Sequence, residues 1–230
     1  MLLLLFDIDG TLLSGATAAH RDAMHEALEE VHGIHPTDRA LRAISPAGRT
    51  DPEIARAILL DAGVSAERID DRADAVREQC CQAYARLCPA DLSEFVLPGV
   101  RELLDSISGR EDVISALLTG NYEAVARLKL ARAGIGGYFK SGQGAFGSDA
   151  DDRVSLPAIA RRRAGTLGHP HPPGETLVIG DTPRDIACAA ADGTRCFAVA
   201  TGPYGPDELS RADAVFANAR ELAAELTGAL

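Results

Sequence analysis

The chain has 230 residues, which suits one sizeable core or a core with a smaller insert, and its 46% hydrophobic and 25% charged residues are those of an ordinary soluble globular protein. Its formal net charge of −11 at pH 7 argues against nucleic acid as a partner, because phosphate backbones are bound by basic surfaces. A small anionic substrate is still allowed, since one divalent cation can reverse the local field.

The first predicted element is a strand over residues 2–6, an unbroken apolar run typical of a strand buried on both faces of a parallel sheet. It is followed by Asp7 and Asp9, which alternate about one residue, so both carboxylates should lie close together at the strand end. Gly10 lets the backbone turn sharply and approach a bound anion. The pattern predicts a site for a cation and a phosphate, the alternative being a simple Asp-Gly turn.

The next part of the chain is predicted to be helical, with no strand between residues 16 and about 94. The helical patterns cover residues 18–31, 37–44, 52–62 and 66–87. We therefore expect an inserted helical domain at 16–94 between two parts of an α/β core, 1–15 and 95–230. Arg49 lies in a break of the helical pattern, from which it could reach the remote end of a substrate or remain solvated.

The α/β pattern resumes with a helix over 99–107 and a buried strand over 113–118. That strand ends in Thr119, Gly120 and Asn121, at the start of a helix predicted over 122–133. The Thr119 hydroxyl could donate to a phosphate oxygen while amides at the helix start assist, or it could simply cap the helix.

A third buried strand is predicted over 176–179 and ends in Asp181, with Pro183 in the first turn of the next helix and Asp185 one turn further on. Acids at two strand ends repel one another unless something positive lies between them. Mg²⁺, which prefers oxygen ligands, is the simplest such ion. The remaining elements are expected over 154–164, 195–200, 213–216 and 219–226.

The run Asp7-Ile8-Asp9-Gly10-Thr11-Leu12 resembles the first motif of the haloacid dehalogenase superfamily of phosphohydrolases. Thr119 resembles its second motif, and Gly180-Asp181 with Asp185 its fourth. The likeness covers essentially the whole chain and is nearest to phosphoglycolate phosphatase-like members with a helical C1-type cap. It implies a Rossmann-like parallel-sheet core beside that cap.

The resemblance also implies roles. Asp7 would attack phosphorus to form an aspartyl phosphate, and Asp9 would act as general acid and base, for which we expect a raised pKa in a closed, dry site. Mg²⁺ would be bound by the Asp7 carboxylate, the Asp9 backbone carbonyl and Asp181, with Asp185 orienting a ligand or its water. The phosphoryl group would contact Gly10, Thr119, Gly120 and Asn121.

The third motif departs from the usual pattern, in which a lysine follows a short strand and neutralises both nucleophile and phosphate. Arg153, just before the predicted helix 154–164, is closest to that position, and a guanidinium can bind phosphate with two donors. Lys129, on the helix after Thr119, is the alternative donor.

The expected activity is therefore Mg²⁺-dependent hydrolysis of a small phosphorylated metabolite. A phosphomutase resembling β-phosphoglucomutase and a catalytically silent Mg²⁺- or phosphate-binding module are the alternatives. A dehalogenase is disfavoured, because that branch lacks the second acid of the first motif and Asp9 is present. Five cysteines without a C-x-x-C pair are typical of reduced thiols in the cytoplasm, no stretch is long enough to span a bilayer, and a monomer or homodimer is expected.

Overall fold

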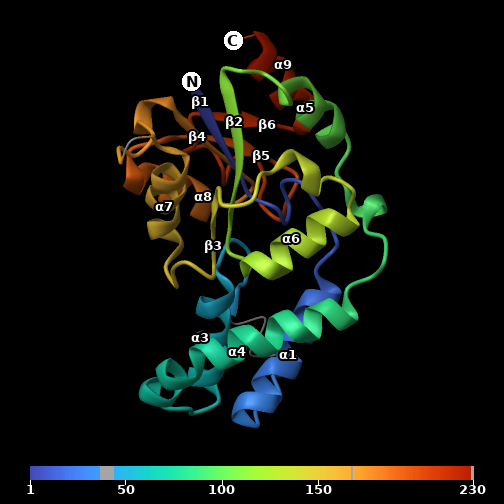
Figure 1. Ribbon diagram of the computed structural model, residues 1–230, viewed down its shortest axis with the longest axis vertical. Coiled ribbons are helices and arrows are strands. Elements are labelled where there is room, and N and C mark those ends of the chain that lie inside the picture. Colours follow the sequence, from blue (N-terminus) through green and yellow to red (C-terminus); the bar gives the residue numbers. More distant parts are fainter. Residues whose placement is uncertain (37–43, 167, 229–230) are drawn as a thin grey trace.

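A six-stranded, all-parallel sheet forms the centre of the protein, with the strand order β3-β2-β1-β4-β5-β6 (Figure 1). The computed structural model describes residues 1–36, 44–166 and 168–228. The strands are β1 (Leu2–Phe6), β2 (Val113–Thr119), β3 (Ala145–Phe146), β4 (Thr176–Gly180), β5 (Arg195–Val199) and β6 (Ala214–Phe216). The predicted α/β class with a parallel core is confirmed. The helix expected over 37–44 falls almost entirely outside the described residues.

Both faces of the sheet are covered by helices, and β1 shows why a continuous apolar run is needed. Leu4 and Phe6 face one core cluster, whereas Leu3 and Leu5 face the other, because successive side chains of a strand point to opposite faces. The first cluster includes helices α5 (Val100–Ile107), α6 (Glu123–Arg132) and α9 (Ala219–Gly228), and the second includes α7 (Leu156–Ala164) and α8 (Pro183–Asp192).

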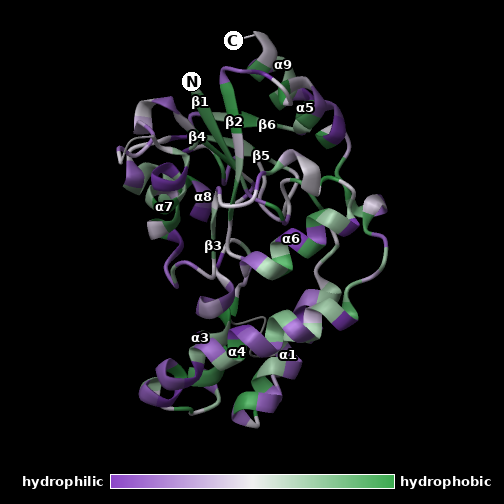
Figure 2. Ribbon diagram, viewed as in Figure 1, coloured by the Kyte–Doolittle hydropathy of each residue, from purple (hydrophilic) through white to green (hydrophobic). Residues whose placement is uncertain are grey.

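Helices α1 (Ala18–His32), α3 (Asp51–Asp61) and α4 (Ala66–Leu87) lie together beyond one edge of the sheet (Figure 1). They belong to residues 16–94, which we call the helical segment. Apolar and polar residues alternate along α1 and α4, so each helix presents one apolar side to the other (Figure 2). Thr50 and Ser65 cap α3 and α4 with their side-chain oxygens.

Two local details differ from the sequence predictions. The helix expected from residue 154 begins at Leu156, after a 3₁₀ turn over Arg153–Ser155 that starts where the Asp152 side chain accepts from the Val154 amide. The two-residue strand β3 was not predicted, since it is too short to show a period.

Strand order decides where a ligand can bind. From β1 the chain builds β2 and β3 on one side and then returns to form β4, β5 and β6 on the other. Phe6 pairs with Leu117 of β2 and with Ile179 of β4, so the carboxyl ends of these three strands lie at the same level. A crevice at such a reversal of strand order is the usual ligand site of open parallel sheets.

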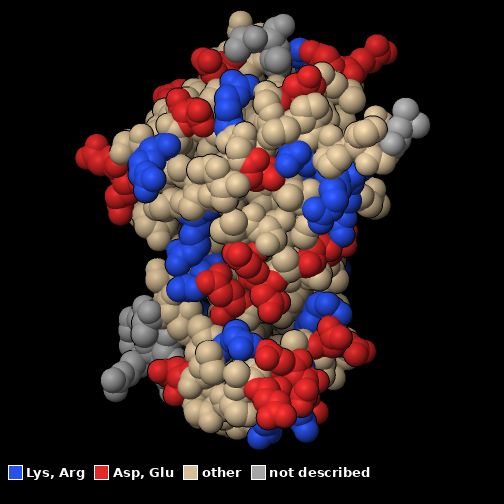
Figure 3. Space-filling model, turned by 90° about the vertical axis from the view of Figure 1, so that its left-hand side faces the viewer, with Lys and Arg blue, Asp and Glu red and all other residues tan. Residues whose placement is uncertain are grey.

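Basic and acidic side chains are interspersed on the face seen in Figure 3, and acidic groups gather on its lower half, over the helical segment. In the described part of the chain, none of the helices has the length and apolar character needed to cross a membrane.

Candidate active site

Three buried carboxylates from the ends of β1 and β4 form the centre of the candidate site. Asp7 follows β1, Asp181 follows β4, and Asp185 lies in the first turn of α8. One oxygen of each lies within 4.8 Å of the other two, the spacing needed to share a metal ion. Acids 174 residues apart in sequence meet because their strands are neighbours in the sheet.

This cluster suits a divalent cation such as Mg²⁺. Asp181 is fully buried, and its Oδ1 accepts a hydrogen bond of 3.2 Å from Thr11, whereas its Oδ2 has no partner. An unpartnered buried carboxylate oxygen is costly unless the acid takes up a proton or a cation binds it. Gly10, at φ +92°, leaves room for it, because a Cβ there would lie 2.1 Å from that Oδ2.

The electrostatics indicate the same need for positive charge. Burial raises the pKa of Asp7 to about 6; the Arg153 guanidinium opposes this rise and the nearby Asp185 and Asp9 add to it. Burial and the charge of Asp7 raise the pKa of Asp181 to about 8. A bound divalent cation would favour the ionised form of both acids and lower these values.

Arg153 lies against this cluster. Its Nη2 is 3.2 Å from Asp7 Oδ1 and 2.5 Å from Asp185 Oδ1, and the side chain is buried. The other oxygen of Asp185 accepts from the amide and hydroxyl of Thr182, which completes a capping box at the start of α8. Asp185 is therefore held between an arginine and a helix end, beside the possible metal position.

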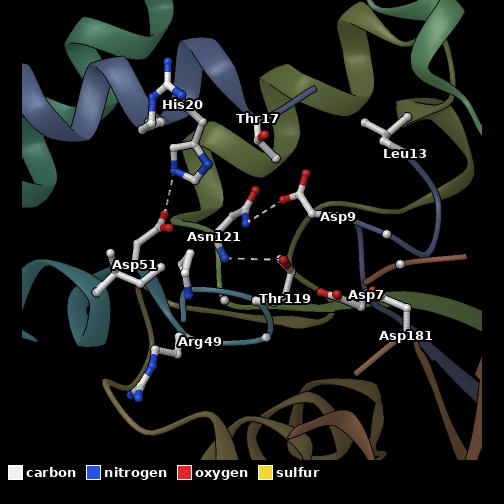
Figure 4. Close-up of a pocket in the computed structure, with 18 of the residues that line it drawn as sticks. Asp7, Asp9, Leu13, Thr17, His20, Arg49, Asp51, Thr119, Asn121 and Asp181 are labelled. Carbon is white, nitrogen blue, oxygen red and sulfur yellow. Dashed lines mark hydrogen bonds and ion pairs between the residues drawn. The ribbon is translucent and has the colours of Figure 1, made fainter. Parts of the chain in front are cut away.

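Asp9 pairs with Lys129 and not with Arg153. Lys129 Nζ lies 2.9 and 2.8 Å from the two Asp9 carboxylate oxygens. Asn121 Nδ2 donates to Asp9 Oδ2 at 3.1 Å (Figure 4). Burial alone would raise the pKa of Asp9, but Lys129 outweighs it and the pKa lies below its ordinary value. The raised pKa that we expected for Asp9 is wrong for this state of the protein, because the sequence did not reveal its buried ammonium partner.

The end of β2 contributes Thr119, Gly120 and Asn121, which line the same pocket as Asp7 and Asp9. The Thr119 hydroxyl accepts from the Asn121 amide at 3.3 Å. A short residue is required at position 120, where a Cβ would lie 2.0 Å from the Arg49 carbonyl oxygen. Gly120 is therefore one of the places where the core and the helical segment are in contact.

Arg49 lines the pocket, but its side chain is directed away from Asp7 and Asp9 (Figure 4). Its guanidinium pairs with Glu53, and its Nε donates to the Ile44 carbonyl at 3.0 Å. Contact with the remote end of a substrate therefore stays a prediction that needs this arginine to turn.

Sequence reasoning missed a pair that links the helical segment to the core. His20 Nε2, on α1, lies 3.0 Å from Asp51 Oδ2, and the same oxygen accepts from the Tyr122 amide at 2.7 Å (Figure 4). The Asp51 amide in turn donates to the Gly120 carbonyl at 2.8 Å. Only the acid at the first position of a helix could have drawn attention to this pair, and such acids usually serve the helix alone.

These residues enclose a cavity of about 540 Å³ between the sheet and the helical segment. The core contributes Asp7, Asp9, Asp181, Thr119 and Arg153 to its lining. The helical segment contributes the charged or polar side chains of His20, Arg21, Arg49 and Asp51 and the apolar side chains of Met24, Ile54 and Ile58. A volume of this order accommodates a small metabolite.

Comparisons with known proteins identify the family and similar folds. The family described as haloacid dehalogenase-like hydrolase matches residues 1–193. One similar solved structure is a β-phosphoglucomutase from Clostridium difficile, with a TM-score of 0.70 and 17% identity over 100% of this chain and 96% of that one. Another is CbbY from Rhodobacter sphaeroides in complex with phosphate, with a TM-score of 0.67 and 20% identity over 96% of each chain. A predicted phosphoglycolate phosphatase from Haemophilus somnus 129PT is also similar, with a TM-score of 0.67 and 20% identity over 99% of this chain and 97% of that one. No curated protein matched the chain.

Proposed function

Because the chain belongs to the haloacid dehalogenase-like hydrolase family, we propose that it is a Mg²⁺-dependent phosphatase acting on a small phosphorylated metabolite. One observation carries the proposal. Asp7, Asp181 and Asp185 bring one oxygen each within 4.8 Å of one another, Asp181 Oδ2 is buried without a partner, and the pocket beside them also holds Thr119 and Arg153. This arrangement offers a cation site and a phosphoryl site that share Asp7.

In the first half of the proposed reaction, an Asp7 oxygen attacks phosphorus as the bond to the leaving oxygen breaks, which gives an aspartyl phosphate and an alcohol. Asp7 suits this role, since a pKa of about 6 leaves it mostly ionised at neutral pH. Thr119 and Arg153 would donate to the phosphoryl oxygens, and the bound cation, held by Asp7, the Asp9 carbonyl and Asp181, would offset their charge.

In the second half, water attacks phosphorus, the Asp7–phosphorus bond breaks and the proton of the water passes to Asp9. The lowered pKa of Asp9 favours the ionised form that this step needs. Protonating an alkoxide leaving group in the first half requires the acid form, so Asp9 must carry a proton when an alkyl phosphate is bound. The net reaction consumes one water and returns both aspartates to their starting forms.

The helical segment, residues 16–94, would act as a cap domain that closes the site against bulk water. Its contact with Gly120 through the Asp51 amide, and its side chains in the lining of the pocket that holds the acids, support this role. We place the protein in the cytoplasm as a monomer or homodimer. In support of that location, all five cysteines are unpaired thiols.

The test is hydrolysis of an aryl phosphate and a panel of phosphate metabolites with and without Mg²⁺. Asp7→Asn should abolish turnover while the chain stays folded, because Arg153 keeps Asp185 as a partner. Asp112→Asn, the same substitution at an exposed acid just before β2, is the matched control and should retain activity. Substantial activity in Asp7→Asn would exclude it as the nucleophile.

The same panel separates the alternatives. A phosphomutase would convert a sugar phosphate to its isomer faster than it releases inorganic phosphate, and the similar fold of a β-phosphoglucomutase makes this the first alternative to test. A silent binding module would bind Mg²⁺ and phosphate without turning over any substrate.

A further inference from the structure

Lys129 is a buried charge whose role the proposed reaction does not explain. It lies on the inward side of α6 beside Val125, Ala126 and Leu130, and none of its side chain is exposed. Lysines are almost never fully buried unless paired, because removing an ammonium from water is expensive. An apolar side chain of similar length would fill this position at lower cost.

The ammonium is saturated by one small group of acceptors. Its three protons match three oxygens, the two of Asp9 at 2.9 and 2.8 Å and Asn121 Oδ1 at 2.9 Å. Asn121 Nδ2 also donates to Asp9 Oδ2 at 3.1 Å, so Asp9 is held from two directions. These contacts fix where the Asp9 carboxylate lies and which way its plane faces.

Charge neutralisation alone does not account for this pair. The Asp9 side chain is 27% exposed, so water reaches part of its carboxylate, although burial by itself would raise its pKa. The more deeply buried Asp7 and Asp185 already have Arg153 as their own cation. A second cation is thus buried beside the one acid of the site that needs it least for stability.

On the premise of the proposed function, we propose that Lys129 is a positioning residue for Asp9. Together with Asn121 it holds the Asp9 carboxylate at the place where water must give up its proton, so that the aspartyl phosphate on Asp7 is hydrolysed. Lys129 forms no contact with Asp7, and the attack on phosphorus does not depend on it. Its removal should therefore slow the second half of the reaction and spare the first.

Burst kinetics with p-nitrophenyl phosphate and Mg²⁺ test this division, because nitrophenolate departs without needing a proton from Asp9. Lys129→Met should release about one nitrophenolate per active site rapidly and then turn over about 10²-fold more slowly than the wild type, the lower range of general acid–base effects. Arg132→Met, an exposed residue of the same helix, is the control and should behave as the wild type. The proposal would be overturned if Lys129→Met lost its burst of nitrophenolate to the same extent as its steady-state rate. It would also be overturned if neither the burst nor the steady-state rate differed from the wild type.

A second comparison holds even where Lys129→Met does not fold. The double variant Asp9→Asn, Lys129→Met removes both charges, which avoids an unpaired buried group. If Lys129 acts only through Asp9, the double variant should turn over within about twofold of Asp9→Asn alone. A double variant at least tenfold slower than Asp9→Asn would show that Lys129 acts by another route.

These kinetic results also distinguish a failure of the role proposed for Lys129 from a failure of the proposed phosphatase function. If the wild type shows no Mg²⁺-dependent turnover sensitive to Asp7→Asn, the proposed function fails. If it does, and the Lys129 variants keep wild-type kinetics, only the positioning role fails.

Discussion

Replacing Arg153 by Met should reveal how much the acidic cluster depends on its internal cation. The Arg153 side chain is 5% exposed, and its guanidinium contacts Asp7 and Asp185 at 3.2 and 2.5 Å. Removing one member of a buried ion pair typically costs about 3–5 kcal/mol, because the partner charge is left uncompensated. In a chain of this size each kcal/mol lowers the unfolding midpoint by about 2–4 °C, so Arg153→Met should lose about 6–20 °C without metal.

The assay is thermal unfolding in EDTA and in Mg²⁺, together with kcat/KM for an aryl phosphate. Mg²⁺ should restore part of the lost midpoint, since it supplies positive charge to the same carboxylates, yet kcat/KM should stay about 10²–10³-fold low, as when one donor to a transferring group is removed. Arg161→Met is the matched control, because Arg161 forms a similarly sheltered pair with Asp192 at 2.7 Å away from the pocket.

Two results would refute the reasoning about Arg153. One is an Arg153→Met enzyme that keeps wild-type kcat/KM. The other is a loss of activity no greater than that of Arg161→Met, which would mean that Arg153 serves the fold and not the phosphoryl group.

Two further predictions concern the helical segment and the metal. Gly120→Ala should reduce kcat/KM about 10²-fold, because the added Cβ would push the Arg49 backbone away by about 1 Å or more. Gly137→Ala is the control and should keep the wild-type kcat/KM, because the space around Gly137 is open. Equal kcat/KM values for the two variants would contradict the close contact at Gly120. Without metal, the pKa values of Asp7 (about 6) and Asp181 (about 8) are raised, so the folded state binds more protons than the unfolded state. The thermal unfolding midpoint should therefore fall as the pH rises from about 4 to about 8. Stabilisation by Mg²⁺ should grow over the same range, and a midpoint in EDTA that rises with pH would disprove this account.

The local sequence pattern was sufficient to predict most of the helices and strands. The helix predicted over 66–87 has those bounds in the structure, and the buried strands before Asp7, Thr119 and Asp181 lie where apolar runs end. These features depend on neighbours within a few residues, through hydrophobic period, caps and turn residues. Parallel strands with polar residues at their carboxyl ends then bring those residues to one edge of a sheet, so sequence alone could predict that these acids would meet.

The assignment of cations to acids was decided by tertiary structure. Arg153 and Lys129 were both candidates for one position, whereas the fold gives the arginine to Asp7 and Asp185 and the lysine to Asp9. No local pattern encodes that choice, because each pair is joined across the sheet by elements more than 30 residues apart. The pKa of Asp9 moved opposite to our expectation for the same reason: burial was predictable from the sequence, but the partner that outweighs burial was not.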